Sequence, residues 1–153
     1  MTLQLSTKEM SLLKDMKGQE ELCIRKYEEC ASKAKSQELS ALFTSMADTE
    51  REHLKTIQQM MSGTVTPVSG GISNSNNNHC ATVPYRTQDD RQEDAFLCQD
   101  MLATEKHAAS LYNTSVFEFT DPVARQVLAH IQWEEQQHGE QLYTFMKNNQ
   151  MYS

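Results

Sequence analysis

Glycine and proline are scarce in this sequence, with five glycines and three prolines in 153 residues, and most of them fall between residues 62 and 84. Outside that stretch little interrupts a helix, because these are the two least favourable residues in a helix interior. Long apolar runs are also absent, and the first residues lack the basic region and apolar core of a signal peptide. We therefore expect a soluble, cytoplasmic protein that neither spans nor binds a membrane.

Basic residues and paired cysteines are in short supply as well. The chain has 14 Lys and Arg against 21 Asp and Glu, a formal charge of -7, so it lacks the basic footprint of a nucleic-acid-binding surface. No C-x-x-C motif occurs, which excludes a zinc knuckle or rubredoxin-type iron site within one chain. We expect no nucleic acid partner, and reduced thiols at Cys23, Cys30, Cys80 and Cys98.

Helical periodicity is what the sequence does have. Apolar residues recur at 3.6-residue spacing in four stretches, and in the third of these they are Leu97, Met101, Ala108 and Tyr112. Helix starts are predicted at Ser6, which forms a possible capping box with Glu9, at Ser36, and at Asp121 before a proline. The pattern predicts an all-α four-helix bundle in one domain, residues 1–153.

The stretch between the second and third helices is long and polar. Two short links predict antiparallel hairpins at residues 7–61 and 89–148, and the linker at 62–88 can span a helix of about 40 Å. An up-down-up-down bundle would not need such a linker. We therefore expect two hairpins joined by a long crossover.

Ionisable residues interrupt the apolar stripes on their inward faces. Each of them lies four residues, about one helical turn, from an apolar residue of the stripe, so it falls on the inward face of its helix. These residues are Glu20, Glu50, His53, Glu105, Glu135 and His138.

The two hairpins also repeat. Adding 85 to Glu20, Glu50 and His53 gives Glu105, Glu135 and His138, without a gap. The same offset relates Tyr27 to Tyr112 and Ser36 to Asp121. The hairpins therefore look like duplicated copies, and the candidate ligands are among the few matched residues.

Chemistry supplies a reason for this set. Four buried carboxylates would repel one another and lose hydration unless they are protonated or paired with cations, and two divalent ions cancel four charges. Glu50 and Glu135 would bridge the ions, Glu20 and Glu105 would each bind one, and His53 and His138 would add one nitrogen each. Such ligands favour two iron or manganese ions. The alternative is a vestigial site with protonated or hydrated carboxylates.

Other residues near the stripes are ambiguous. The hydroxyls of Tyr27 and Tyr112 could hydrogen-bond a ligating carboxylate, although core packing explains them equally well. An exposed patch at Trp133 and Phe117 would indicate a homodimer face. We expect solvated rather than ligating imidazoles at His79, His107 and His130.

The order Glu, Glu-x-x-His, Glu, Glu-x-x-His resembles the ferritin-like di-metal carboxylate proteins, which include rubrerythrins and manganese catalases. The resemblance implies a ferritin-like bundle that handles oxygen or hydrogen peroxide as a peroxidase, catalase or ferroxidase, with bridging Glu50 and Glu135 at the reactive centre. Without a rubredoxin module, electrons would come from an external donor.

The last 55 or so residues also resemble the bacterial spore coat F family. The likeness is carried by Asp100-Met101-Leu102, Lys106, Tyr112-Asn113, Glu118, Arg125-Gln126-Val127-Leu128, Glu134, Leu142-Tyr143, Met146 and Tyr152. It implies deposition in the spore coat. Two further functions stay open beside the oxidant-handling one: a structural coat protein whose metals serve stability, and an iron-binding protein that forms no cage.

Overall fold

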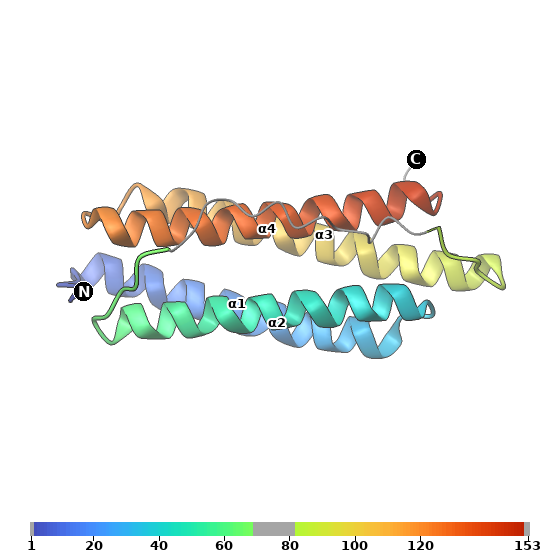
Figure 1. Ribbon diagram of the computed structural model, residues 1–153, viewed down its shortest axis with the longest axis horizontal. Coiled ribbons are helices and arrows are strands. Elements are labelled where there is room, and N and C mark those ends of the chain that lie inside the picture. Colours follow the sequence, from blue (N-terminus) through green and yellow to red (C-terminus); the bar gives the residue numbers. More distant parts are fainter. Residues whose placement is uncertain (1, 69–81, 152–153) are drawn as a thin grey trace.

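A computed structural model of the chain describes residues 2–68 and 82–151. It contains four α-helices: α1 (Thr7–Lys33), α2 (Gln37–Met61), α3 (Gln88–Val116) and α4 (Pro122–Asn148). They lie side by side along one long axis (Figure 1). The all-α four-helix bundle predicted from the periodicity is confirmed.

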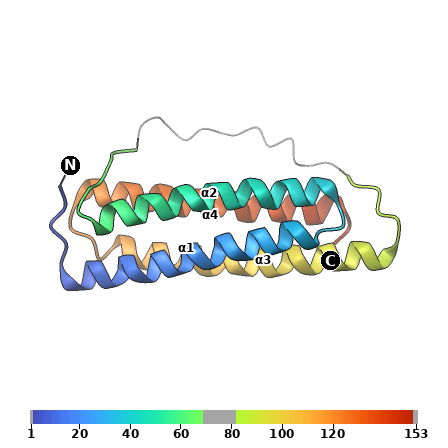
Figure 2. The ribbon, with the colours of Figure 1, turned by 90° about the horizontal axis from the view of Figure 1, so that it is seen from below.

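The helices pair as two antiparallel hairpins. α1 packs closely on α2, and α3 packs closely on α4. α2 ends at one end of the bundle and α3 begins at the other, so these two helices run in the same direction (Figure 2). The chain therefore crosses the length of the bundle between them, as the long linker predicted. His79 and Cys80 lie outside the described residues.

Side-chain caps fix the helix starts. Ser6 and Glu9 form the predicted capping box, with Glu9 N–H donating to Ser6 Oγ at 3.1 Å and Ser6 N–H donating to Glu9 Oε1 at 2.9 Å. Ser36 and Asp121 also cap their helices as predicted, and Thr87 caps α3. Each cap satisfies amide groups that lack a partner within the first turn of the helix.

The core has a charged layer between two apolar clusters. Each helix passes from one cluster to the other through a buried glutamate: on α1, for example, Glu20 follows Met16 of one cluster and precedes Tyr27 of the other. Cys98 is fully buried in the first cluster, whereas Leu97, which the third stripe places in the core, is only partly buried. The inward face of α3 is thus rotated by one residue from the predicted face at its start.

Two further buried carboxylates tie each hairpin to the other. Asp94 on α3 accepts hydrogen bonds from the backbone N–H groups of Lys35 and Ser36 in the α1–α2 link, at 2.7 and 3.0 Å. Glu9 on α1 accepts from Thr120 N–H in the α3–α4 link at 3.3 Å. Subtracting 85 from 94 gives 9, so these contacts obey the same repeat as the site. Sequence analysis assigned Glu9 only to the capping box and missed Asp94.

Within the described residues, none of the helices combines the length and apolar character needed to cross a membrane. Cys23, Cys30 and Cys98 are buried free thiols, as expected. Burial raises the pKa of the Cys30 thiol to about 11 and that of Cys23 further still.

Candidate metal centre

The bundle brings the six predicted side chains together in its charged layer. Their ligand atoms form two groups within which all atoms lie within 4.8 Å of one another. Both groups contain Glu50 and Glu135; one adds Glu20 and His53, and the other adds Glu105 and His138. All six residues are at most 5% exposed. The arrangement therefore has two shared carboxylates and two halves with the same residue types.

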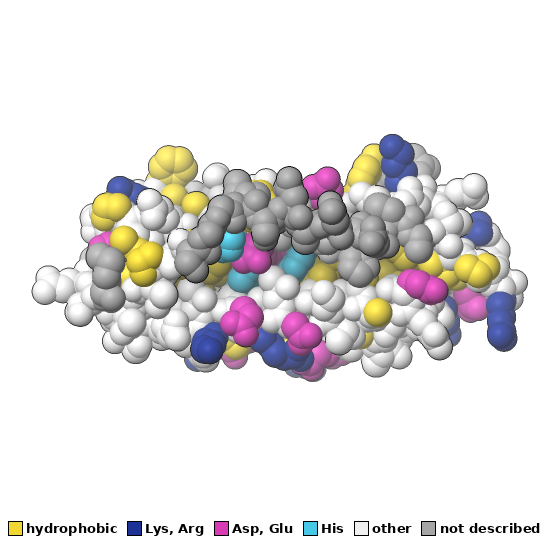
Figure 3. Space-filling view, viewed as in Figure 1, with side chains coloured by type: hydrophobic (Ala, Val, Ile, Leu, Met, Phe, Trp, Pro, Cys, Tyr) yellow, Lys and Arg dark blue, Asp and Glu magenta, His cyan; other side chains and the backbone are white. Residues whose placement is uncertain are grey.

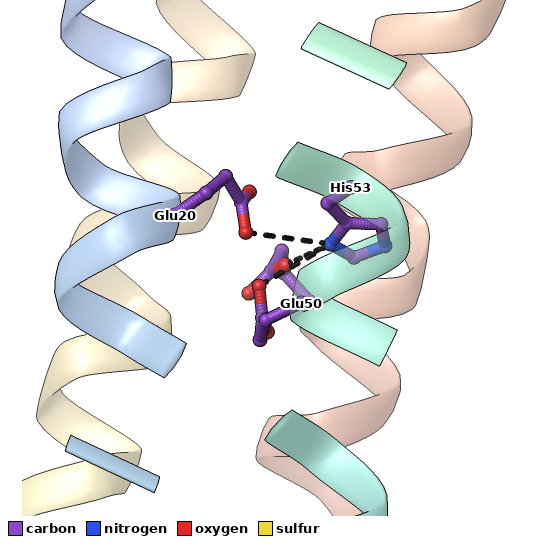
Figure 4. A group of neighbouring side chains, drawn as sticks. Glu20, Glu50 and His53 are labelled. Carbon is purple, nitrogen blue, oxygen red and sulfur yellow. Dashed lines mark hydrogen bonds and ion pairs between the residues drawn. The ribbon is translucent and has the colours of Figure 1, made fainter. Parts of the chain in front are cut away.

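In the first half, His53 turns its Nδ1 atom toward the carboxylates (Figure 4). This atom lies 2.7 Å from Glu135 Oε1, 3.3 Å from Glu50 Oε2 and 3.7 Å from Glu20 Oε2. The imidazole thus faces one carboxylate from its own helix, one from α1 and one from α4.

The second half mirrors the first. His138 Nδ1 lies 3.0 Å from Glu50 Oε1 and 3.4 Å from Glu105 Oε1. The two oxygens of Glu50 therefore point to different histidines, Oε2 to His53 and Oε1 to His138. A carboxylate between two nitrogen ligands is placed to bridge two cations.

Two buried tyrosines bracket the charged layer. Tyr112 OH donates to Glu20 Oε1 at 2.6 Å, and Tyr27 OH donates to Glu105 Oε1. Each phenol thus reaches a glutamate of the opposite hairpin. Burial, together with the neighbouring carboxylate, raises the pKa of both phenols well above 10, so they remain donors. The sequence favoured hydrogen bonding and simple core packing equally for these two tyrosines, and both hydrogen bonds are present.

The electrostatics of the cluster favour the binding of protons or other positive charge. Burial and a hydrogen bond shared with Glu50 raise the pKa of Glu20 to about 8, and burial with the neighbouring Glu105 raises that of Glu135 well above 4.5. Burial alone would lower the pKa of His138, but contacts with Glu105 and Glu50 raise it to about 9. Protons thus collect where carboxylates crowd in a low dielectric.

Glu50 is the exception among the carboxylates. Burial would raise its pKa, but hydrogen bonds from Glu20, His138 and His53 hold it well below 4.5. The anion at the centre of the cluster is therefore retained, and the surrounding groups carry the compensating protons.

Several carboxylate oxygens in the layer are left without hydrogen-bond partners among the described residues. They are fully enclosed by the bundle, where an unpaired acceptor is costly. These atoms are Glu20 Oε2, Glu105 Oε2 and Glu135 Oε2. Unsatisfied carboxylate oxygens in a layer that also holds two imidazoles fit a pair of hard or borderline divalent cations, and the donor set of four carboxylates and two nitrogens suits iron or manganese.

One contact at the site was missed by sequence analysis. Glu134 Oε1 lies 3.2 Å from His53 Nε2, on the side of the ring that faces away from the cluster. The same oxygen lies 3.1 Å from His130 Nε2. Histidine and acidic side chains gather at the middle of the face formed by α2 and α4 (Figure 3). The only sequence signal for this contact was the acidic pair Glu134-Glu135.

The other described histidines, together with Phe117 and Trp133, lie outside the cluster. His107 is exposed, and His130 is 35% exposed, as expected for solvated groups, although His130 contacts Glu134. Phe117 is 82% exposed, whereas Trp133 is partly buried and stacks on His130 with ring centroids 6.0 Å apart. A homodimer through these residues stays a prediction.

Comparison with known families gives one match. Residues 93–153 match a family model described as the Coat F domain. The matched segment holds most of α3 and all of α4, and with them Glu105, Glu135 and His138. It supports the resemblance to spore coat F proteins seen in the sequence. No curated protein and no solved structure matches the chain.

Proposed function

We propose that this chain is a ferritin-like spore coat protein of the coat F type that holds two iron or manganese ions and handles oxygen or hydrogen peroxide. The observation that supports the metal centre most strongly is the mirrored cluster of four buried carboxylates and two imidazoles. The coat F match over the second hairpin supports the setting.

The proposal assigns each residue a part. Glu50 and Glu135 belong to both ligand groups and would bridge the ions. Glu20 with His53, and Glu105 with His138, would complete one position each. When bound, such ions supply redox chemistry that the side chains themselves lack.

The remaining residues of the core would prepare the site. Tyr112 holds Glu20 Oε1, which leaves Glu20 Oε2 facing His53 Nδ1 at 3.7 Å. Tyr27 holds Glu105 Oε1, the oxygen that also lies 3.4 Å from His138 Nδ1. The two apolar clusters above and below limit the access of water and keep the local dielectric low. Since the sequence has no paired C-x-x-C motif, electrons would come from an external donor.

Metal analysis of protein purified without chelator tests the proposal. We expect close to two equivalents of iron or manganese per chain, and a new absorption band when ferrous ion and air are added to the metal-free protein. Less than about half an equivalent, with no spectral change, would refute it. Sustained peroxide consumption by the loaded protein would establish turnover.

A structural role in the coat is the second candidate, and the coat F match favours it. In that case the bundle itself would serve assembly, and any bound ions would not turn over. Coat assembly would then be unaffected by Glu50→Ala, while the loaded protein would consume no peroxide. Repeated rounds of ferrous oxidation at each site would instead indicate an iron-oxidising protein.

A further inference from the structure

The two imidazoles of the centre are not supported equally. His53 presents Nδ1 to the carboxylates and contacts Glu134 through Nε2, at 3.2 Å. His138 also presents Nδ1 to the carboxylates. Among the described residues, no carboxylate lies within ion-pair distance of His138 Nε2.

The repeat explains this difference residue by residue. Subtracting 85 from Glu134 and His130 gives Thr49 and Ser45. The hydroxyl of Thr49 donates to the Ser45 backbone carbonyl at 3.4 Å and so is engaged within its own helix. The first hairpin therefore offers no acid at the place from which Glu134 reaches His53.

Glu134 is itself held in place. Its Oε1 contacts His130 at 3.1 Å as well as His53, and His130 stacks on Trp133 with an interplanar angle of 28°. The Glu134 side chain is 32% exposed, and its contact with His130 already restricts its movement. Holding the imidazole of His53 therefore costs it little further conformational entropy. The outer nitrogen of His53 thus has a carboxylate partner. Among the described residues His138 Nε2 has no such partner, and its ring packs edge-on against Tyr27 with centroids 6.0 Å apart.

A carboxylate on the outer nitrogen of a ligating histidine fixes the tautomer and orientation of the ring and increases its basicity. We propose that the two metal positions are inequivalent, an inference that rests on the proposed metal centre. Glu134 is then a positioning residue that makes the position beside His53 bind its ion more tightly. The chain would then load a first ion beside Glu20 and His53 before a second beside Glu105 and His138.

Manganous ion titrated into variants that keep one half tests this inference. His138→Ala retains the position beside His53, and His53→Ala retains the other. We expect the His138→Ala protein to bind one ion about 10- to 100-fold more tightly than the His53→Ala protein. Electron paramagnetic resonance of the free ion measures both affinities directly. Using single-position proteins removes the repulsion between two bound ions from the comparison.

Glu134 variants supply the decisive arm. In the His138→Ala background, Glu134→Ala should abolish the tighter binding of the ion, and Glu134→Gln, which keeps an oxygen acceptor, should retain part of it. Added to His53→Ala, Glu134→Ala should leave the affinity unchanged. Glu140→Gln, at an exposed position on the same helix, is the matched control. Thermal melting of the metal-free variants separates any loss of fold.

Equal affinities in the two single-position proteins, or an equal effect of Glu134→Ala on both, would overturn the inequivalence and leave the metal centre standing. Absence of bound ion in the unaltered chain would overturn the metal centre itself.

Discussion

The two hairpins solve the same electrostatic problem with the same residues, but their surroundings differ. Each provides two glutamates, a histidine and a tyrosine, and each tyrosine reaches across to the other hairpin. Outside this set the match fades: Cys23 corresponds to Ala108, and Glu134 to Thr49.

The comparison shows which positions the core constrains. A buried carboxylate needs a counter-charge and a donor, so residues that supply these occur in both halves. On the proposed assignment, residues behind the ligands would tune the site without deciding whether it forms, so the halves can differ there.

The largest expected effect separates shared from unshared ligands. Glu135→Ala should weaken the binding of both ions by more than about 100-fold, because losing one partner from a buried ionic cluster costs about 3–5 kcal/mol. Glu105→Ala should weaken mainly one ion. The mirrored pair, Glu50→Ala and Glu20→Ala, should behave alike in calorimetric titration. Loss of both ions on removing a terminal glutamate would break the equivalence.

Stability of the metal-free protein should fall as pH rises from about 5 to 9. The folded state raises the pKa of Glu20 from 4.5 to about 8 and that of His138 from 6.5 to about 9, so in this range it binds more protons than the unfolded chain. Glu50, with its lowered pKa, loses stability only below about 4.5 and does not oppose the trend.

Urea unfolding at about pH 5.5 and 8.5, with and without manganous ion, measures this trend. Stabilisation by the ion should grow with pH, because binding displaces protons from its ligands. A metal-free protein that gains stability toward pH 8.5 would contradict the described proton uptake.

Next in size is the pair of contacts that tie the hairpins together. Asp94→Ala strands two backbone amides and the Tyr85 hydroxyl, which donates to Asp94 Oδ2 at 2.7 Å, and should cost about 2–4 kcal/mol of unfolding free energy. Glu9→Ala loses a helix cap and one longer contact, and should cost about 1 kcal/mol. Chemical denaturation measures the unfolding free energy of both variants. A larger loss for Glu9→Ala than for Asp94→Ala would contradict the predicted order.

The smallest effect tests the tyrosines as equals. Tyr27→Phe and Tyr112→Phe each remove a hydroxyl donor from a buried carboxylate oxygen, so each should destabilise the metal-free protein by about 1–2 kcal/mol. Their values should agree within experimental error. A cost for only one of them would show that the halves differ closer to the ligands than described.

Much of this architecture was predictable from the sequence because it rests on spacing. Helical periodicity, the caps at Ser6, Ser36 and Asp121, and the 85-residue repeat predicted the bundle and the convergence of the site. Charged residues at core positions can be recognised from their spacing in the sequence, because a helix turns by a fixed angle per residue.

What escaped prediction depends on contacts between helices. Glu134 lies beside the inward stripe, and only the packing of α4 on α2 shows that it reaches His53. Asp94 drew no prediction from the sequence, yet it is fully buried against the other hairpin's link. Side-chain reach across an interface has no periodic signature, so such partners emerge only with the fold.

Anomalous diffraction at the iron and manganese edges, from crystals of protein purified without chelator, tests the central claim most directly. The account predicts two peaks inside the bundle, one beside Glu20 and His53 and one beside Glu105 and His138. An interior without anomalous density, with the six side chains linked only by protons or water, would contradict it.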